Sequence, residues 1–234
     1  MTVEEILVEL ERLGSPANIA GMRRYKVCGD KAFGVAMPVL RAMARRVKRD
    51  QALAEALWNT GYHEARILAS LVGDPAAITE QTMDRWAAEI DSWAVCDALC
   101  GNLFDRTPLA WRKAVEWSRR KEEFVRRAGY VLITQLAVHD KKASDDKLLK
   151  FLPHLKRGAT DERNFVRKAV NWALRQIGKR SPALHEAAIR TAEEIRAMDS
   201  KAARWIAADA LRELRSDAVR ERIQTWRRKS KSQP

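Results

Sequence analysis

The chain has 234 residues, and its 44 Lys and Arg residues against 31 Asp and Glu residues give a formal net charge of +13. A chain of this length builds one large domain or one repeat array, and the positive charge favours nucleic acid as a partner over an anionic membrane surface or a merely solvated surface. No segment approaches the roughly 20 apolar residues of a membrane span, which excludes a transmembrane helix from the expected fold.

The pattern of apolar residues is helical from the first segment onward. Residues 1–14 are acidic and amphipathic, which is not the pattern of a signal peptide. The three cysteines (Cys28, Cys96 and Cys100) form no CxxC pair, and the four histidines are scattered. The sequence therefore predicts packed thiols, no metal site, no cofactor and a reducing cytoplasmic location.

The segment 91–104 (DSWAVCDALCGNLF) contains the first residues that could carry chemistry. On a helical wheel of roughly 100° per residue, an apolar arc includes Trp93, and Asp97 falls at the edge of that arc. The two residues are i, i+4 neighbours on one face. A carboxylate beside apolar groups is partly desolvated, so it either has a function or pairs with a nearby Arg or caps the next helix.

An internal repeat lies in the second half of the chain. FVRRA at 124–128 recurs 41 residues later as FVRKA at 165–169, and looser echoes occur at 63–74 and 201–214. A helical repeat of about 40 residues is typical of HEAT or armadillo arrays. We therefore expect an all-α fold, a right-handed α-α superhelix of HEAT-like repeats forming a curved solenoid, with residues 1–226 as one domain with a concave DNA-binding face and 227–234 as a flexible basic tail.

The two repeats also place basic residues beside their apolar stripes. Arg127 lies just beyond the stripe of the first repeat, and Lys168 takes its place in the second. Trp172 stands where the first repeat has Val131, and it is either a core residue or part of a binding surface. A basic rim on successive repeats is what a groove that follows a phosphate backbone requires.

Several of these segments together resemble the AlkD-type DNA glycosylases, the HEAT-like-repeat enzymes of DNA alkylation repair. SWAVCD resembles the family signature Trp-x-x-x-Asp, and Tyr25 followed by Gly34-Val35 and Pro38 resembles the N-terminal element. Arg127-Ala128 and the run from Trp172 to Arg175 match two later motifs. The chain departs from the pattern at Ser92, where members can carry a second Trp, and at Ala36, where some carry a polar residue.

The resemblance implies a role for each matching residue. Asp97 would be the catalytic carboxylate, with Trp93 and Trp172 packed against the damaged nucleotide and Tyr25 as a third aromatic near the lesion. Arg127 would hold a phosphate beside the lesion, and Arg175 would make a further backbone contact.

The function that the resemblance implies is hydrolysis of the N-glycosidic bond of cationic alkylated purines in duplex DNA. The enzyme would be a monomer that releases 7-methylguanine and 3-methyladenine and leaves an abasic site. Two alternatives come from other classes: a non-catalytic DNA-binding protein that recognises bent or branched DNA, and a protein-interaction solenoid. The carboxylate at 97 weighs against the first alternative, and the net charge of +13 weighs against the second.

Overall fold

The computed structural model describes residues 1–231 of the backbone and the side chains of residues 1–225. Every regular element in this part of the chain is a helix, which confirms the predicted all-α class. Backbone contacts divide the chain into two compact units, Met1–Ala110 and Trp111–Pro234. The predicted boundary at 226/227 falls within the last helix, which continues to Lys231, and residues 232–234 lie outside the described part.

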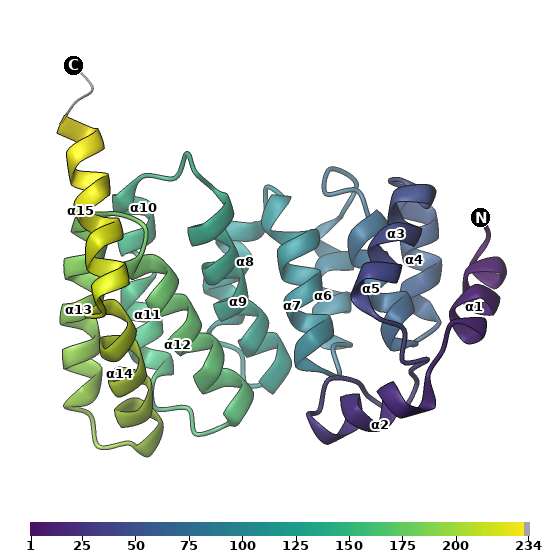
Figure 1. Ribbon diagram of the computed structural model, residues 1–234, viewed down its shortest axis with the longest axis horizontal. Coiled ribbons are helices and arrows are strands. Elements are labelled where there is room, and N and C mark those ends of the chain that lie inside the picture. The colour runs from purple at the N-terminus through teal and green to yellow at the C-terminus, as the bar shows by residue number, and fades with distance from the viewer. Residues whose placement is uncertain (232–234) are drawn as a thin grey trace. The chain divides into compact units, whose positions relative to one another are not determined.

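The helices of the first unit are short (Figure 1). They are α1 (Val3–Arg12), α2 (Pro16–Arg24), α3 (Met37–Val47), α4 (Gln51–Asn59), α5 (His63–Val72), α6 (Glu80–Ala88) and α7 (Trp93–Asn102), followed by the 3-10 turn η1 (Phe104–Arg106). Side-chain caps explain where several of them begin, because a hydroxyl or carboxylate at the N-cap accepts from a free backbone N–H. The capping residues are Thr2, Ser15, Asp50, Thr79 and Ser92.

The core of the first unit is built around α5. This helix packs against α3, α4 and α7, and most of its residues are buried. Trp58 and Trp86 are fully buried and stacked, with ring centroids 4.5 Å apart. Because α3 and α7 both pack against the buried helix α5, their positions relative to each other are fixed within this unit.

The second unit contains longer helices. They are α8 (Ala110–Trp117), α9 (Glu123–His139), α10 (Asp145–Leu149), α11 (Leu152–Gly158), α12 (Asn164–Gly178), α13 (Pro182–Arg196), α14 (Lys201–Leu214) and α15 (Asp217–Lys231). In this unit α9 packs beside α12, and α12 packs beside α14, while α13 contacts both α12 and α14 (Figure 1).

The predicted repeat is visible in this packing. The helices α9 and α12 begin at Glu123 and Asn164, 41 residues apart, and each carries one copy of the repeated pentad. The first residues of the two pentads, Phe124 and Phe165, meet across the helix pair with ring centroids 5.5 Å apart. The repeat therefore places equivalent residues of the two neighbouring helices in contact with each other.

The described part of the chain contains no membrane-spanning helix, metal-binding group or disulfide. None of its helices combines the length and apolar character needed to cross a membrane. Its His, Cys, Asp and Glu side chains form no group of three or more that could hold a metal ion. Cys28, Cys96 and Cys100 are buried and form no disulfide, as expected for packed thiols.

Candidate functional site

The candidate residues of the first unit are centred on the start of α7. Ser92 caps the helix by accepting from Val95 N at 3.4 Å. Val95, Cys96 and Leu99 are buried, whereas Trp93 and Asp97 are half-buried. The predicted arrangement of an apolar arc with Asp97 at its edge is therefore present on α7.

A buried thiol lies close to Asp97. Burial raises the pKa of the Cys100 thiol well above its usual value, and its hydrogen bond to Cys96 and the charge of Asp97 add to the increase. Because this thiol stays neutral, it places no second negative charge beside the carboxylate of Asp97. Asp105 also raises the pKa of this thiol, so the carboxylates of Asp97 and Asp105 both lie near the buried side of the helix.

The structure brings Tyr25 to Trp93, although the two are far apart in sequence. The Trp93 indole Nε1 donates to the backbone carbonyl of Tyr25 at 3.2 Å. Tyr25 itself caps the C-terminus of α2 and is 68% exposed, with the Arg24 guanidinium 5.8 Å from its ring centroid. The first unit therefore presents an exposed aromatic, a cation and a carboxylate-bearing helix start in one region.

A buried carboxylate that the sequence analysis did not single out holds the loop between α2 and α3. Glu64 of α5 is fully buried and accepts from three successive backbone N–H groups, those of Phe33, Gly34 and Val35, at 2.9, 2.7 and 3.2 Å. The sequence carries little signal for this role, because His63 and Arg66 beside Glu64 resemble an ordinary polar start of a helix; full burial of an acid is rare without bound partners.

Gly34 is required by the path of the same loop. Its φ is +80°, and a Cβ at this position would lie 2.4 Å from the carbonyl oxygen of Ser15. Asn18 of α2 donates to the Gly34 carbonyl at 2.9 Å. These contacts fix the loop that begins at Tyr25 against α2 and α5, and Ala36 at its end is an exposed N-cap of α3.

A second anchor lies just before α7. Arg66 of α5 pairs with Asp91 at 3.2 Å, donates to the Glu89 carbonyl at 3.0 Å and stacks over Trp58 with its guanidinium carbon 4.9 Å from the ring centroid. The turn that leads into Trp93 is thereby held to the same central helix as the loop that carries Tyr25.

The second unit carries the remaining predicted residues, and their environments differ. Arg127 on α9 is only 5% exposed and donates to the carbonyl of Phe165 on α12 at 2.6 Å. Its position favours a role in holding the two repeat helices together, since a phosphate contact needs an accessible guanidinium. Lys168, its equivalent on α12, is exposed and pairs with no carboxylate among the described side chains.

Trp172 follows Lys168 by one helical turn on α12 and is half-buried. When the Gln176 amide oxygen faces its donors, it accepts from Trp172 Nε1 at 3.3 Å and from Lys179 Nζ at 3.2 Å. The indole is therefore tied by its polar edge, and part of its surface remains accessible.

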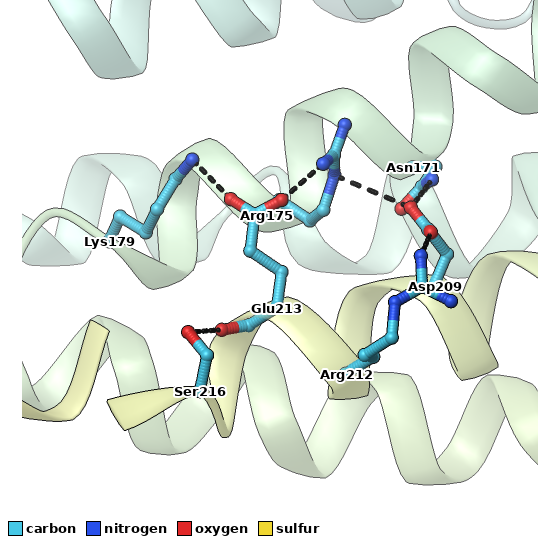
Figure 2. Close-up of polar contacts among 7 residues, drawn as sticks. All are labelled: Asn171, Arg175, Lys179, Asp209, Arg212, Glu213 and Ser216. Carbon is cyan, nitrogen blue, oxygen red and sulfur yellow. Dashed lines mark hydrogen bonds and ion pairs between the residues drawn. The ribbon is translucent and has the colours of Figure 1, made fainter. Parts of the chain in front are cut away.

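Arg175 is committed to an ion-pair network between α12 and α14 (Figure 2). It makes a short contact with Glu213 and lies 3.9 Å from Asp209, while Lys179 reaches the other oxygen of Glu213 at 2.5 Å. Burial by itself would raise the pKa of Glu213, but the hydrogen bonds from Lys179 and Arg175 outweigh it and lower the pKa. Glu213 is therefore ionised at neutral pH.

The different exposure of Arg127 and Lys168 leads to opposite expectations for alanine variants. Lys168→Ala should leave the Tm unchanged and reduce the salt dependence of DNA binding by about 0.9 in the log–log slope, as expected for one lost phosphate contact. Arg127→Ala should instead lower the free energy of unfolding by about 2 kcal/mol, because it removes a buried charged hydrogen bond.

Thermal unfolding and DNA titrations at several salt concentrations separate the two effects. If the Arg127→Ala protein has an unchanged Tm and a smaller salt dependence of DNA binding, Arg127 contacts a phosphate and is not a structural residue.

Comparison with known proteins supports both the fold and the resemblance. A family model described as DNA alkylation repair enzyme matches residues 6–226. A solved structure, described as that of a new family of proteins related to the HEAT-like repeat DNA glycosylases with affinity for branched DNA structures, is 23% identical with a TM-score of 0.75. The match covers 91% of this chain and 95% of that chain, and it shows the HEAT-like fold. No curated protein matches the chain.

Proposed function

The chain belongs to the DNA alkylation repair enzyme family, and from this premise we propose that it is a DNA glycosylase that hydrolyses the N-glycosidic bond of cationic alkylated purines in duplex DNA. The proposed substrates are 7-methylguanine and 3-methyladenine, and the proposed product is an abasic site. The enzyme acts as a monomer in the cytoplasm and needs no cofactor. The observation that carries the proposal is the Trp93–Asp97 pair at the start of α7.

The chemistry needs only one carboxylate. A purine alkylated at N3 or N7 is already cationic, so it leaves as a neutral base without a general acid. Positive charge then develops on the deoxyribose, and a fixed carboxylate stabilises it and orients the attacking water. In this mechanism Asp97 is the stabilising group, and the buried Cys100 thiol, whose pKa is raised by burial, adds no negative charge beside it.

The aromatic residues also stabilise the cationic substrate. An indole or phenol face attracts a cationic group by about 0.5–2 kcal/mol. Trp93 shares a helix face with Asp97, and Tyr25 is exposed and linked to Trp93 through its carbonyl. In the second unit Trp172 is the corresponding aromatic, one turn after the exposed Lys168.

DNA binding is supplied by the basic surface. The formal net charge is +13, and cations without carboxylate partners are the ones that replace the counterions of DNA. Lys168 meets this condition better than Arg127, which is buried, or Arg175, which is ion-paired. We therefore assign the phosphate contact of α12 first to Lys168.

The alternative is a protein that binds bent or branched DNA without cleaving a glycosidic bond. One observation favours it: the solved structure with the same fold is described by its affinity for branched DNA structures. A binding protein has no use for a carboxylate beside Trp93, so the two functions differ in what they require of α7.

The deciding experiment compares two activities of the same preparation. The protein is incubated with methylated duplex DNA, and released 7-methylguanine and 3-methyladenine are separated by chromatography and quantified. Binding to a four-way junction and to a matched unmodified duplex is measured in parallel. Release of methylated bases supports the glycosylase, whereas junction-selective binding without release supports the alternative.

A further inference from the structure

Side chains of α12 and α14 form a ladder of contacts at a constant spacing. Arg167 stacks over Trp205 at 5.0 Å, Asn171 donates to Asp209 at 2.6 Å, and Arg175 pairs with Glu213. Successive rungs lie one helical turn apart on each helix. At its end, two cations meet on one carboxylate (Figure 2).

The end of this ladder has the composition of an oxyanion site. Arg175 and Lys179 each bind a different oxygen of the Glu213 carboxylate. A phosphodiester also offers two non-bridging oxygens, and a planar guanidinium together with an ammonium is a common way to bind them. The Glu213 carboxylate thus occupies the place that a phosphate would take.

The site is neither fully buried nor fully open. The side chains of Arg175, Lys179 and Glu213 are 27%, 16% and 28% exposed. Arg175 Nε is buried without a hydrogen bond and faces Asp209 at 3.9 Å, so the contact with Glu213 is made by the outer part of the guanidinium. A partly exposed ion pair can exchange its anion, because the incoming phosphate regains the contacts that the carboxylate gives up.

We propose that Arg175 and Lys179 form a latent phosphodiester site that Glu213 occupies in the free protein, so that DNA must displace this carboxylate to engage the end of α12. Asp209 holds the other side of Arg175 and keeps the guanidinium oriented toward the site. The proposal rests on the DNA binding included in the proposed function, and it is independent of base release. Because the ion pair of Glu213 with Arg175 and Lys179 must be broken first, Glu213 weakens the binding of unmodified duplex DNA.

Glu213→Gln tests the proposal, because it removes the charge while preserving the shape of the side chain. On unmodified duplex DNA the variant should bind at least about threefold more tightly at low salt, with a log–log salt slope steeper by about 0.9 for one additional phosphate contact. Glu213→Ala, which leaves no amide in the site, should change affinity and slope in the same direction. Circular dichroism and Tm verify that each variant is folded.

The matched control is Glu193→Gln on α13. Glu193 pairs with Arg215, and its substitution changes the net charge by the same amount without releasing a cation of α12. It should give a much smaller gain and leave the slope unchanged. Adding Arg175→Gln to Glu213→Gln should cancel the gain, because the released guanidinium is then absent.

Two outcomes would overturn the proposal: equal effects of the Glu213 and Glu193 variants, or a gain that persists without Arg175. Since the readout is binding to DNA without lesions, a gain in the Glu213 variants together with no base release would reject the glycosylase and leave the phosphate site standing.

Discussion

Asp97→Asn will lower the rate of 7-methylguanine release by about a hundredfold to a thousandfold, the range found when one preorganised electrostatic contact to a transition state is removed. Asparagine has the same shape but no charge, so it cannot stabilise the positive deoxyribose. Affinity for unmodified duplex DNA should stay within about a factor of three, because removing a negative charge does not weaken attraction to phosphate. Single-turnover release and a binding titration measure the two quantities.

The control for this prediction is Asp30→Asn. Asp30 is exposed in the loop that begins at Tyr25, and its substitution changes the net charge by the same amount. It should release base at the wild-type rate. If Asp97→Asn also releases base normally, the carboxylate is not catalytic, and if Tm, binding and release all fall together, Asp97 has a structural role.

Glu64→Ala will lower the free energy of unfolding by about 3 kcal/mol or more, since it leaves buried N–H groups without an acceptor. The carboxylate accepts from Phe33, Gly34 and Val35, and no part of it reaches solvent. A loss of this size corresponds to a decrease in Tm of about 10 °C for a chain of this length. Base release should also fall, because the loop held by Glu64 begins at Tyr25, whose carbonyl orients Trp93.

Hydrogen exchange distinguishes a local from a global effect. In the Glu64→Ala protein the amides of Phe33, Gly34 and Val35 should lose protection before those of the core helices. Glu55→Gln is the matched control, because Glu55 pairs with Arg85 in a partly exposed ion pair whose loss should cost less than about 1 kcal/mol. Equal losses from both variants would contradict the role assigned to Glu64.

The features that were predictable from the sequence are local or periodic. The apolar arc of α7, with Trp93 and Asp97 four residues apart, follows from helical geometry alone. The repeated pentads at 124–128 and 165–169 likewise determine that α9 and α12 begin at equivalent positions. Such patterns depend only on residues within one helix or one repeat, so a single sequence contains them.

The features that were not predictable depend on what stands opposite a residue. Arg127 and Lys168 occupy equivalent repeat positions, yet one is buried against the Phe165 carbonyl and the other is exposed. A helical wheel places both at the edge of the apolar stripe and cannot tell which edge a neighbouring helix covers. The ion pair of Arg175 could not be foreseen for the same reason, because its partner Glu213 lies 38 residues away.

Four features could be predicted from residue type and helical period: the all-helical class, the repeat, the positive charge and the position of Asp97 beside Trp93. Only the tertiary structure decided that Glu64 holds the loop starting at Tyr25, that Arg127 is interior and that Arg175 is neutralised by α14. The physical reason is that hydrogen bonds and ion pairs are short-ranged, so the role of a polar side chain is settled by the helix that packs against it.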